Sequence, residues 1–173
     1  MTEYVVLVDE RDNEIGTAEK LRAHQQGGQL HRAFSIFIFD TAGRLLIQRR
    51  APTKYHYAGL WANTCCSHPR PGELLLDAAC RKLQQEMGFV TELRPVLSFV
   101  YHATDDHTGL TEHEYDHVLL GSHDRDPRIN PSEADMFRWA AVDELVRDLA
   151  RQPHVYTPWF RIALAALLER GLT

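Results

Sequence analysis

The sequence has few cysteines, no long apolar segment and no excess of positive charge. Its 3 cysteines, the adjacent Cys65 and Cys66 and the isolated Cys80, form neither a disulfide framework nor a CxxC pair. Thiols used so sparsely are typical of a reducing compartment, and we expect a cytoplasmic protein. No apolar run approaches the roughly 18–20 residues of a membrane span, and the start MTEYVVLVDERD has no signal-peptide pattern. We therefore expect a soluble protein with no membrane partner.

The charge balance excludes another class of partner. The 19 Lys and Arg residues against 24 Asp and Glu residues give a formal net charge of −5. Such a chain lacks the positive field that non-specific nucleic-acid binding needs, so an anionic ligand must be bound by a local basic cluster. A length of 173 residues with 44% hydrophobic and 25% charged residues fits one globular domain over residues 1–173. We expect a monomer.

Strand and helix signals alternate along the chain, which predicts an α+β fold with a mixed sheet flanked by helices. Strands are expected at 4–8 (paired with a strand beyond the turn at 9–13), 32–40, 44–49, 93–103, 112–121 and 137–142. Helices are expected at 19–26, 73–87, 143–151 and 158–170, with Asp143 as an N-cap and Gly88 as a C-cap. The aromatic-rich segment 51–63 has no clear period and is predicted to be a loop that lines a pocket.

Carboxylates and histidines are the main candidates for chemistry. Glu112 and Glu114 are two residues apart in a predicted strand, so both side chains project from one face. Three histidines in loops or at element ends could join them: His24, His31 and His68. Such a set would suit Mn²⁺, Mg²⁺ or Zn²⁺. The alternative is that Glu112, Glu114 and Asp116 form a solvated strand face and that the histidines are structural.

A thiol stands close to one of these histidines. Cys66 is two residues before His68, and it is a candidate acid or base. The alternative is a buried, inert thiol, since cysteine is among the most buried residue types. Cys80 is predicted to be part of the core.

Residues 67–89 resemble the Nudix box, a loop–helix–loop that binds divalent metal and diphosphate. The equivalent positions are Ser67, Glu73, Arg81-Lys82, Gln85-Glu86 and Gly88. Three positions depart from the box: Ser67 replaces a Gly, Lys82 replaces a Glu, and Gln85 replaces one of the paired Glu residues. Because a Nudix hydrolase uses the full carboxylate cluster to hold metals and activate water, these departures weaken the hydrolase interpretation.

The same departures, together with NTCCSHP at 63–69 and EHE at 112–114, resemble the type I isopentenyl-diphosphate isomerase branch of the Nudix superfamily. Other matching pieces are spread in order over nearly the whole chain: Glu19-Lys20, His24, Leu30-His31, Arg49-Arg50, Lys54, Tyr101 with Ala103-Thr104-Asp105, and Pro158-Trp159. The resemblance implies a Nudix-like mixed sheet in a single compact domain. It also implies that the histidines are more than structural and that the carboxylates do not form a solvated strand face.

The resemblance assigns roles to these residues. It implies a divalent ion, Mn²⁺, Mg²⁺ or Zn²⁺, on His24, His31, His68, Glu112 and Glu114. It implies Mg²⁺ at Glu86, where the ion also contacts the substrate diphosphate. Cys66 and Glu114 match the catalytic pair, and four basic residues match the diphosphate site: Lys20, Arg50, Lys54 and Lys82. Tyr101 and Trp159 complete the expected catalytic set. Trp159, with Trp61 and Tyr101 as further possibilities, would offer a ring face to a developing carbocation.

The implied reaction interconverts isopentenyl diphosphate and dimethylallyl diphosphate by adding and removing a proton through a tertiary carbocation-like state, as a step of isoprenoid biosynthesis. The segment 51–63 and the N-terminal segment would cover the pocket. Two alternatives remain. One is a Nudix pyrophosphohydrolase, and the other is a catalytically silent module that binds metal or diphosphate. The silent module is disfavoured because binding alone needs neither the thiol of Cys66 nor the second carboxylate of Glu114.

Overall fold

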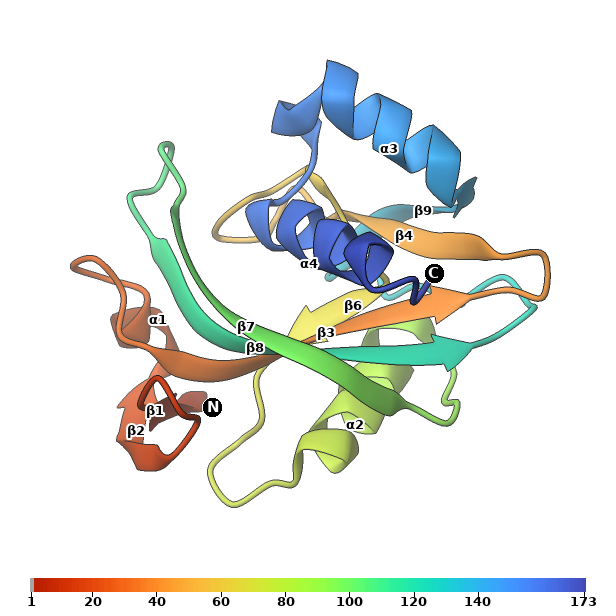
Figure 1. Cartoon of the computed structure of the whole chain (residues 1–173). Helices are drawn as coiled ribbons and strands as arrows, with labels where there is room; N and C mark the ends of the chain where they lie inside the picture. The colour runs from red at the N-terminus through yellow and green to blue at the C-terminus, as the bar shows by residue number, and fades with distance from the viewer. Residues whose placement is uncertain (1) are drawn as a thin grey trace.

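The computed structural model describes residues 2–173, in which the β-branched and apolar segments form one mixed sheet (Figure 1). Its nine strands are β1 (Tyr4–Val8), β2 (Glu14–Glu19), β3 (His31–Phe39), β4 (Arg44–Arg50), β5 (Trp61–Ala62), β6 (Cys65–Ser67), β7 (Arg94–Thr104), β8 (Thr111–Ser122) and β9 (Ala134–Ala141). The helices are α1 (Lys20–Ala23), α2 (Leu75–Met87), α3 (Val142–Arg151) and α4 (Pro158–Glu169), with a 3₁₀ turn at Pro153–Val155. The predicted α+β fold class is confirmed.

Strand β3 is the centre of the sheet, and its pairing determines which other strands lie next to one another. It pairs with β1 at its start, with β8 in parallel along its whole length, with β6 in its middle and with β4 at its end. Strand β4 then leaves β3 and pairs with β9 and β5, while β7 pairs with the outer edge of β8. The sheet therefore curls around the start of β3, and segments distant in sequence meet there (Figure 1).

The register of these strands places chemically important residues side by side. Glu114 on β8 is opposite His31 on β3 and opposite Tyr101 on β7. On the other side of β3, Ser35 is opposite Cys66 of β6. Because side chains alternate along a strand, this register brings residues of β3, β6, β7 and β8 to one region of the sheet.

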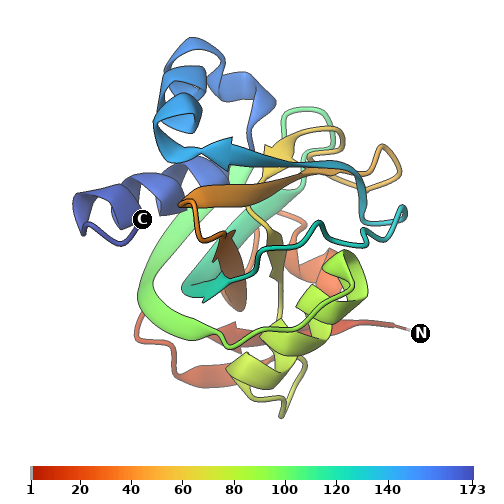
Figure 2. The ribbon, with the colours of Figure 1, turned by 90° about the vertical axis from the view of Figure 1, so that its right-hand side faces the viewer.

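Two apolar cores hold the sheet between helices, and α2 and α4 lie on opposite sides of β3 and β8 (Figures 1 and 2). Alternation along β3 explains the two cores, since Phe34, Ile36 and Ile38 pack toward α2 whereas Phe37 packs with Phe160 of α4. Strand β6 behaves in the same way, with Cys65 in the α2 core and Cys66 on the α4 side.

Gly88 ends helix α2 in the way that the sequence predicts. Its φ of +76° is in the left-handed region, and its N–H donates to the carbonyl of Gln84. A side chain at this position would also collide with a neighbour, since an added Cβ would lie 2.8 Å from both Cβ and the carbonyl oxygen of Arg128. Gly88 is therefore required both by the backbone conformation and by the close approach of the segment that leads to β9.

Several expected element boundaries are wrong. Helix α1 has only four residues, Lys20–Ala23, because the chain turns at His24 to meet β8 through the Thr111 N–H. Helix α3 begins at Val142, after an N-cap Ala141 that makes no side-chain hydrogen bond, so Asp143 is not the cap. The predicted loop 51–63 includes the short strand β5. Cys80 is only half-buried at the edge of the α2 core.

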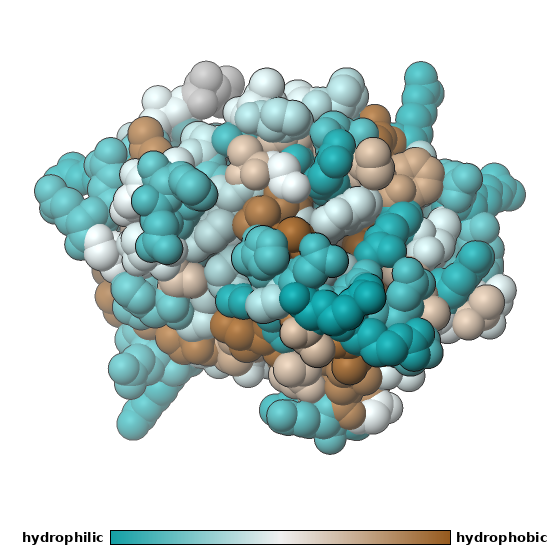
Figure 3. Space-filling model, turned by 90° about the horizontal axis from the view of Figure 1, so that it is seen from above, coloured by the Kyte–Doolittle hydropathy of each residue, from teal (hydrophilic) through white to brown (hydrophobic). Residues whose placement is uncertain are grey.

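On the face shown in Figure 3, hydrophobic patches are small and lie among hydrophilic side chains. None of the helices in residues 2–173 is long and apolar enough to cross a membrane.

Candidate active site

A cavity of about 230 Å³ opens where β3, β6, β7 and β8 meet the start of α4. Most of the predicted site residues line it: Lys20, Arg50, Lys54, Cys66, His68, Lys82, Glu86, Tyr101, Glu112, Glu114 and Trp159. His24 and His31 are fully buried behind this wall. The cavity is also lined by residues that the sequence did not single out for the site: Glu3, Phe34, Tyr55, His56, Ser67 and Glu133.

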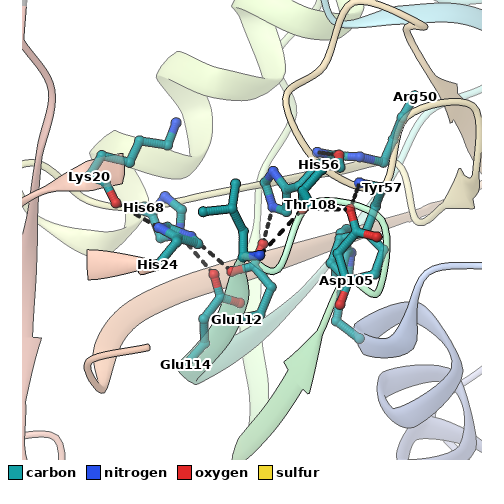
Figure 4. A network of polar contacts seen from close by, with 12 residues as sticks. Lys20, His24, Arg50, His56, Tyr57, His68, Asp105, Thr108, Glu112 and Glu114 are labelled. Carbon is teal, nitrogen blue, oxygen red and sulfur yellow. Dashed lines mark hydrogen bonds and ion pairs between the residues drawn. The ribbon is translucent and has the colours of Figure 1, made fainter. Parts of the chain in front are cut away.

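Five of these residues form a cluster that could hold a divalent metal ion. One donor atom from each of His24, His31, His68, Glu112 and Glu114 lies within 4.8 Å of all the others. Figure 4 shows the imidazoles of His24 and His68 turned toward the two carboxylates. The two Glu side chains are buried, and Asp116 beyond them is fully buried, so the alternative of a solvated strand face is wrong.

The hydrogen bonds of the histidines suit metal binding. His24 Nδ1 donates to the carbonyl of Lys20 over 2.6 Å, and His31 Nδ1 donates to the carbonyl of Gln29 over 2.7 Å. These bonds fix the tautomer that leaves both Nε2 lone pairs free on the side of the cluster. His31 Nε2 is also 3.2 Å from His68 Nε2, and His24 Nε2 is 2.9 Å from Glu112 Oε2. A cation among these donors would satisfy atoms that are otherwise poorly partnered in a buried place.

The electrostatics of the cluster lower the pKa of both carboxylates and shift the pKa values of two of its histidines, His24 and His68, in opposite directions. Burial and the neighbouring Glu112 carboxylate would raise the pKa of Glu114, yet the contacts with the His31 and His68 imidazoles outweigh both and lower it. Burial lowers the pKa of His68 to about 4, whereas at His24 the neighbouring Glu112 carboxylate outweighs burial and raises the pKa. Metal binding requires deprotonated ligands, and His68 and the two carboxylates present them at neutral pH.

Cys66 and Glu114 differ in their protonation. Burial raises the pKa of the Cys66 thiol to about 12, so this side chain keeps its proton at neutral pH. Glu114 is ionised and accepts a hydrogen bond from the Tyr101 hydroxyl, with 2.5 Å between Tyr101 Oη and Glu114 Oε2. The cavity is thus lined by one group that holds a proton and one that can accept a proton.

The basic residues of the cavity are largely paired with carboxylates that line the same space. Lys20 Nζ is 2.9 Å from Glu3 Oε2, and Lys54 Nζ is 2.6 Å from Glu133 Oε2. Lys82 Nζ is 3.0 Å from Oε1 of the buried Glu86 and 3.4 Å from Oε1 of Glu133. The cations lie at the cavity, as an anion site requires, but a bound anion would compete with these carboxylates.

Arg50 is the basic residue without such a partner among residues 2–173. Its side chain is buried, its Nη2 donates to the carbonyl of His56, and its Nε has no hydrogen-bond partner in this part of the chain. The guanidinium carbon lies 5.3 Å from the ring centroid of Trp159, at cation–π distance. Arg50 therefore contributes uncompensated positive charge to the cavity.

Of the two tryptophans considered for the cavity, only Trp159 lines it. Its indole Nε1–H donates to Asn63 Oδ1 over 3.1 Å, which fixes the ring, and the edge of Tyr57 packs against it. Trp61 is directed elsewhere, with the guanidinium of Arg138 5.2 Å from its ring centroid, so it does not provide a wall of this cavity. The sequence around Trp61 does not predict that its ring packs against Arg138.

His56 and Glu133 are the notable site residues that sequence reasoning missed. His56 lies in the loop 51–60, and its Nε2 is hydrogen-bonded to Glu112 Oε1 (Figure 4). Glu133 lies in the irregular segment before β9 and contacts both Lys54 and Lys82. Neither residue belongs to a periodic segment. The only available signal was that the aromatic loop would line a pocket.

Known proteins match this chain over most of its length. The NUDIX domain family matches residues 29–160. An isopentenyl-diphosphate Delta-isomerase of Halorhodospira halophila is 54% identical over 160 residues, which cover 92% of this chain and 91% of that protein. An isopentenyl-diphosphate Delta-isomerase 2 of Aromatoleum aromaticum is 53% identical over 173 residues, which cover 100% of this chain and 88% of that protein.

Solved structures agree on the fold. The protein DR0079 of Deinococcus radiodurans superposes with a TM-score of 0.72 at 22% identity, covering 86% of this chain and 90% of that one. A MutT protein of Methanosarcina mazei superposes with a TM-score of 0.68 at 16% identity, covering 83% and 96%. The chain therefore belongs to the NUDIX domain family and, within it, to the isopentenyl-diphosphate Delta-isomerases.

Proposed function

We propose that this protein interconverts isopentenyl diphosphate and dimethylallyl diphosphate, as a step of isoprenoid synthesis. The observation that carries the proposal is the placement of Cys66 and Glu114 in one cavity with four basic side chains. Relatives about half identical over nearly the whole chain are named for this isomerase, and their names do not favour a pyrophosphohydrolase.

The chemistry requires a proton to be added to an unactivated alkene and another to be removed from the neighbouring carbon. One protein group must hold a proton and a second must be ready to accept one. The pKa of Cys66, raised to about 12 by burial, and the ionised Glu114 meet these two needs. Tyr101 orients Glu114 through the 2.5 Å hydrogen bond and is placed to hold or pass a proton at its hydroxyl.

A tertiary carbocation-like state needs protection and stabilisation between the two proton transfers. The Trp159 ring can stabilise positive charge by about 0.5–2 kcal/mol through its π face. The loop 51–60 supplies Lys54, Tyr55 and His56 to the cavity wall, and Glu3 of the N-terminal segment also lines it. These segments would exclude water from a product that ionises readily.

Diphosphate binding falls to Lys20, Arg50, Lys54 and Lys82, which would exchange their carboxylate partners for phosphate oxygens. We further propose Mg²⁺ at Glu86 together with the diphosphate, and a second divalent ion, Mn²⁺, Mg²⁺ or Zn²⁺, at His24, His31, His68, Glu112 and Glu114. When bound, these ions would neutralise diphosphate charge and tune the proton affinity of the Glu114 carboxyl.

The test is to incubate the protein with isopentenyl diphosphate, Mg²⁺ and Mn²⁺ in D₂O and to analyse the recovered diphosphates by NMR. We expect dimethylallyl diphosphate that carries deuterium. Cys66→Ala and Glu114→Gln should each lower turnover by at least about 10²-fold. Cys80→Ala removes a half-buried thiol outside the cavity and should retain activity. Unchanged substrate, with metal content and reduced thiols verified, would contradict the proposal, and phosphate release from nucleoside diphosphates would point instead to a hydrolase.

A further inference from the structure

His56 is an imidazole beside the His/Glu cluster but outside its set of donor atoms. Among residues 2–173, the donors that lie within 4.8 Å of one another come from three other histidines and two Glu residues. The His56 ring is 5.6 Å from the His24 ring between centroids, and its Nε2 is hydrogen-bonded to Oε1 of Glu112. The other oxygen of the same carboxylate, Oε2, is 2.9 Å from His24 Nε2. Glu112 is thus held on both oxygens, by a cluster histidine and by His56.

The loop 51–60 is built to place His56 at this carboxylate. The carbonyl of His56 accepts a hydrogen bond from Arg50 Nη2 over 3.1 Å, and the N–H of the next residue, Tyr57, donates to Asp105 Oδ2 over 3.1 Å. Asp105 is in turn held by the hydroxyl of Thr108. Figure 4 shows this chain of contacts from Asp105 through Tyr57 and His56 to Glu112.

Local strain and burial indicate that this placement is specific. Tyr57 has φ of +49°, a left-handed conformation that costs a non-glycine residue of order 1 kcal/mol or more and persists where the surroundings impose it. His56 itself is only 5% exposed, and the ring of Tyr55 stacks on it with centroids 4.4 Å apart. A buried imidazole whose ring is stacked and whose backbone carbonyl is hydrogen-bonded is a rigid donor.

We propose that His56 is a positioning residue for the metal centre: its Nε2–H holds Glu112 Oε1 so that Glu112 presents Oε2 to a divalent ion. The carboxylate would then bind the ion through one oxygen, in an orientation set by the loop 51–60. The inference rests on the metal site of the proposed function and does not depend on the isomerase reaction. Removal of a residue that orients a metal ligand typically costs about 10–100-fold in metal affinity.

The test measures Mn²⁺ affinity by titration calorimetry, without substrate, on the metal-free protein. His56→Phe keeps the ring volume and removes the donor, and it should weaken Mn²⁺ binding by about 10–100-fold. His56→Gln keeps an amide donor and should recover most of the affinity. His117 provides the matched control, since its Nε2 contacts Asp12 Oδ2 at 2.9 Å away from the cavity, and His117→Phe should bind Mn²⁺ within about twofold of the parent.

Three outcomes would overturn the inference. His56→Phe could bind Mn²⁺ as tightly as the parent, His56→Gln could lose as much affinity as His56→Phe, or the parent itself could fail to bind Mn²⁺. A Co²⁺ absorption spectrum adds a second readout that also applies if the Phe variant does not fold. Bands of the same position and intensity in the parent and in His56→Gln support a positioning role, whereas loss of an imidazole ligand would make His56 a direct ligand. Normal metal binding without isomerisation would refute the proposed function and leave this inference standing.

Discussion

Tyr101→Phe tests the hydrogen bond that orients the Glu114 carboxylate. The bond is 2.5 Å long and lies in a buried setting, with Tyr101 6% exposed and Glu114 7% exposed. Hydrogen bonds to charged groups contribute about 1.5–3 kcal/mol, and each 1.36 kcal/mol in the barrier is tenfold in rate. If the bond matters most when Glu114 exchanges a proton, the substitution should lower kcat by roughly 10- to 150-fold with little change in KM.

Tyr57→Phe is the matched control for this experiment. It removes the same atom from another buried tyrosine, which packs against Trp159 but whose hydroxyl has no hydrogen-bond partner among residues 2–173. Loss of that hydroxyl should leave turnover within about threefold and should not lower the free energy of unfolding. Turnover would be followed by NMR with isopentenyl diphosphate in D₂O. A Tyr101→Phe protein as active as the parent, or equal losses in both variants, would refute the reasoning.

Other features of the structure give three further expectations. Glu133→Gln removes the carboxylate that competes with diphosphate for two lysines. A partly buried pair contributes about 1 kcal/mol, so calorimetry should show about fivefold tighter binding of inorganic diphosphate. The control Asp135→Asn breaks a 2.7 Å pair with an arginine outside the cavity and should leave diphosphate binding unchanged. Weaker binding by Glu133→Gln would contradict this. Cys66, with its pKa raised to about 12, remains a thiol at neutral pH, so peptide mapping of the metal-free protein should show slow alkylation by iodoacetamide at pH 7 and a rate that rises about tenfold per pH unit below that pKa; fast modification at pH 7 would contradict the burial argument. Gly88→Ala should lower the free energy of unfolding by about 1–3 kcal/mol more than Gly72→Ala, because both have left-handed backbones but only the first would clash with a neighbour, and equal losses in denaturant titrations would refute the steric part.

The long periodic elements were predictable from sequence because local patterns determine them. The apolar stripe of α2 and the C-cap Gly88 predicted that helix. The apolar and alternating strand patterns predicted the bounds of β3, β7 and β8 to within one or two residues. The pairing of these strands was not predictable, since β3 joins β8 in parallel across a separation of about eighty residues. No local sequence pattern determines which strand will pair with the edge of another buried apolar strand.

The candidate site divides in a similar way. The residue types and their spacing made the cluster residues candidates, because a strand places Glu112 and Glu114 on one face whatever the tertiary structure, and the family resemblance selected them over the structural alternatives. The partners of the cations could not be found in this way. The Lys54–Glu133 pair depends on where an irregular segment crosses the cavity, and no periodicity positions such a segment.

Under the proposed function, the pairing of cations with carboxylates would also explain how an acidic chain binds diphosphate without a strongly positive cavity. Lys54 and Lys82 would repel each other if both were unpaired, and Glu133 relieves that repulsion in the absence of ligand. A diphosphate carries enough negative charge to replace the carboxylate at both lysines, so binding exchanges one set of ion pairs for another. Affinity then depends on the difference between the two sets, and Arg50, which has no carboxylate partner in residues 2–173, contributes its attraction undiminished. Under the proposed function, we therefore expect charge and geometry together to select the substrate, since a weaker anion would not displace Glu133.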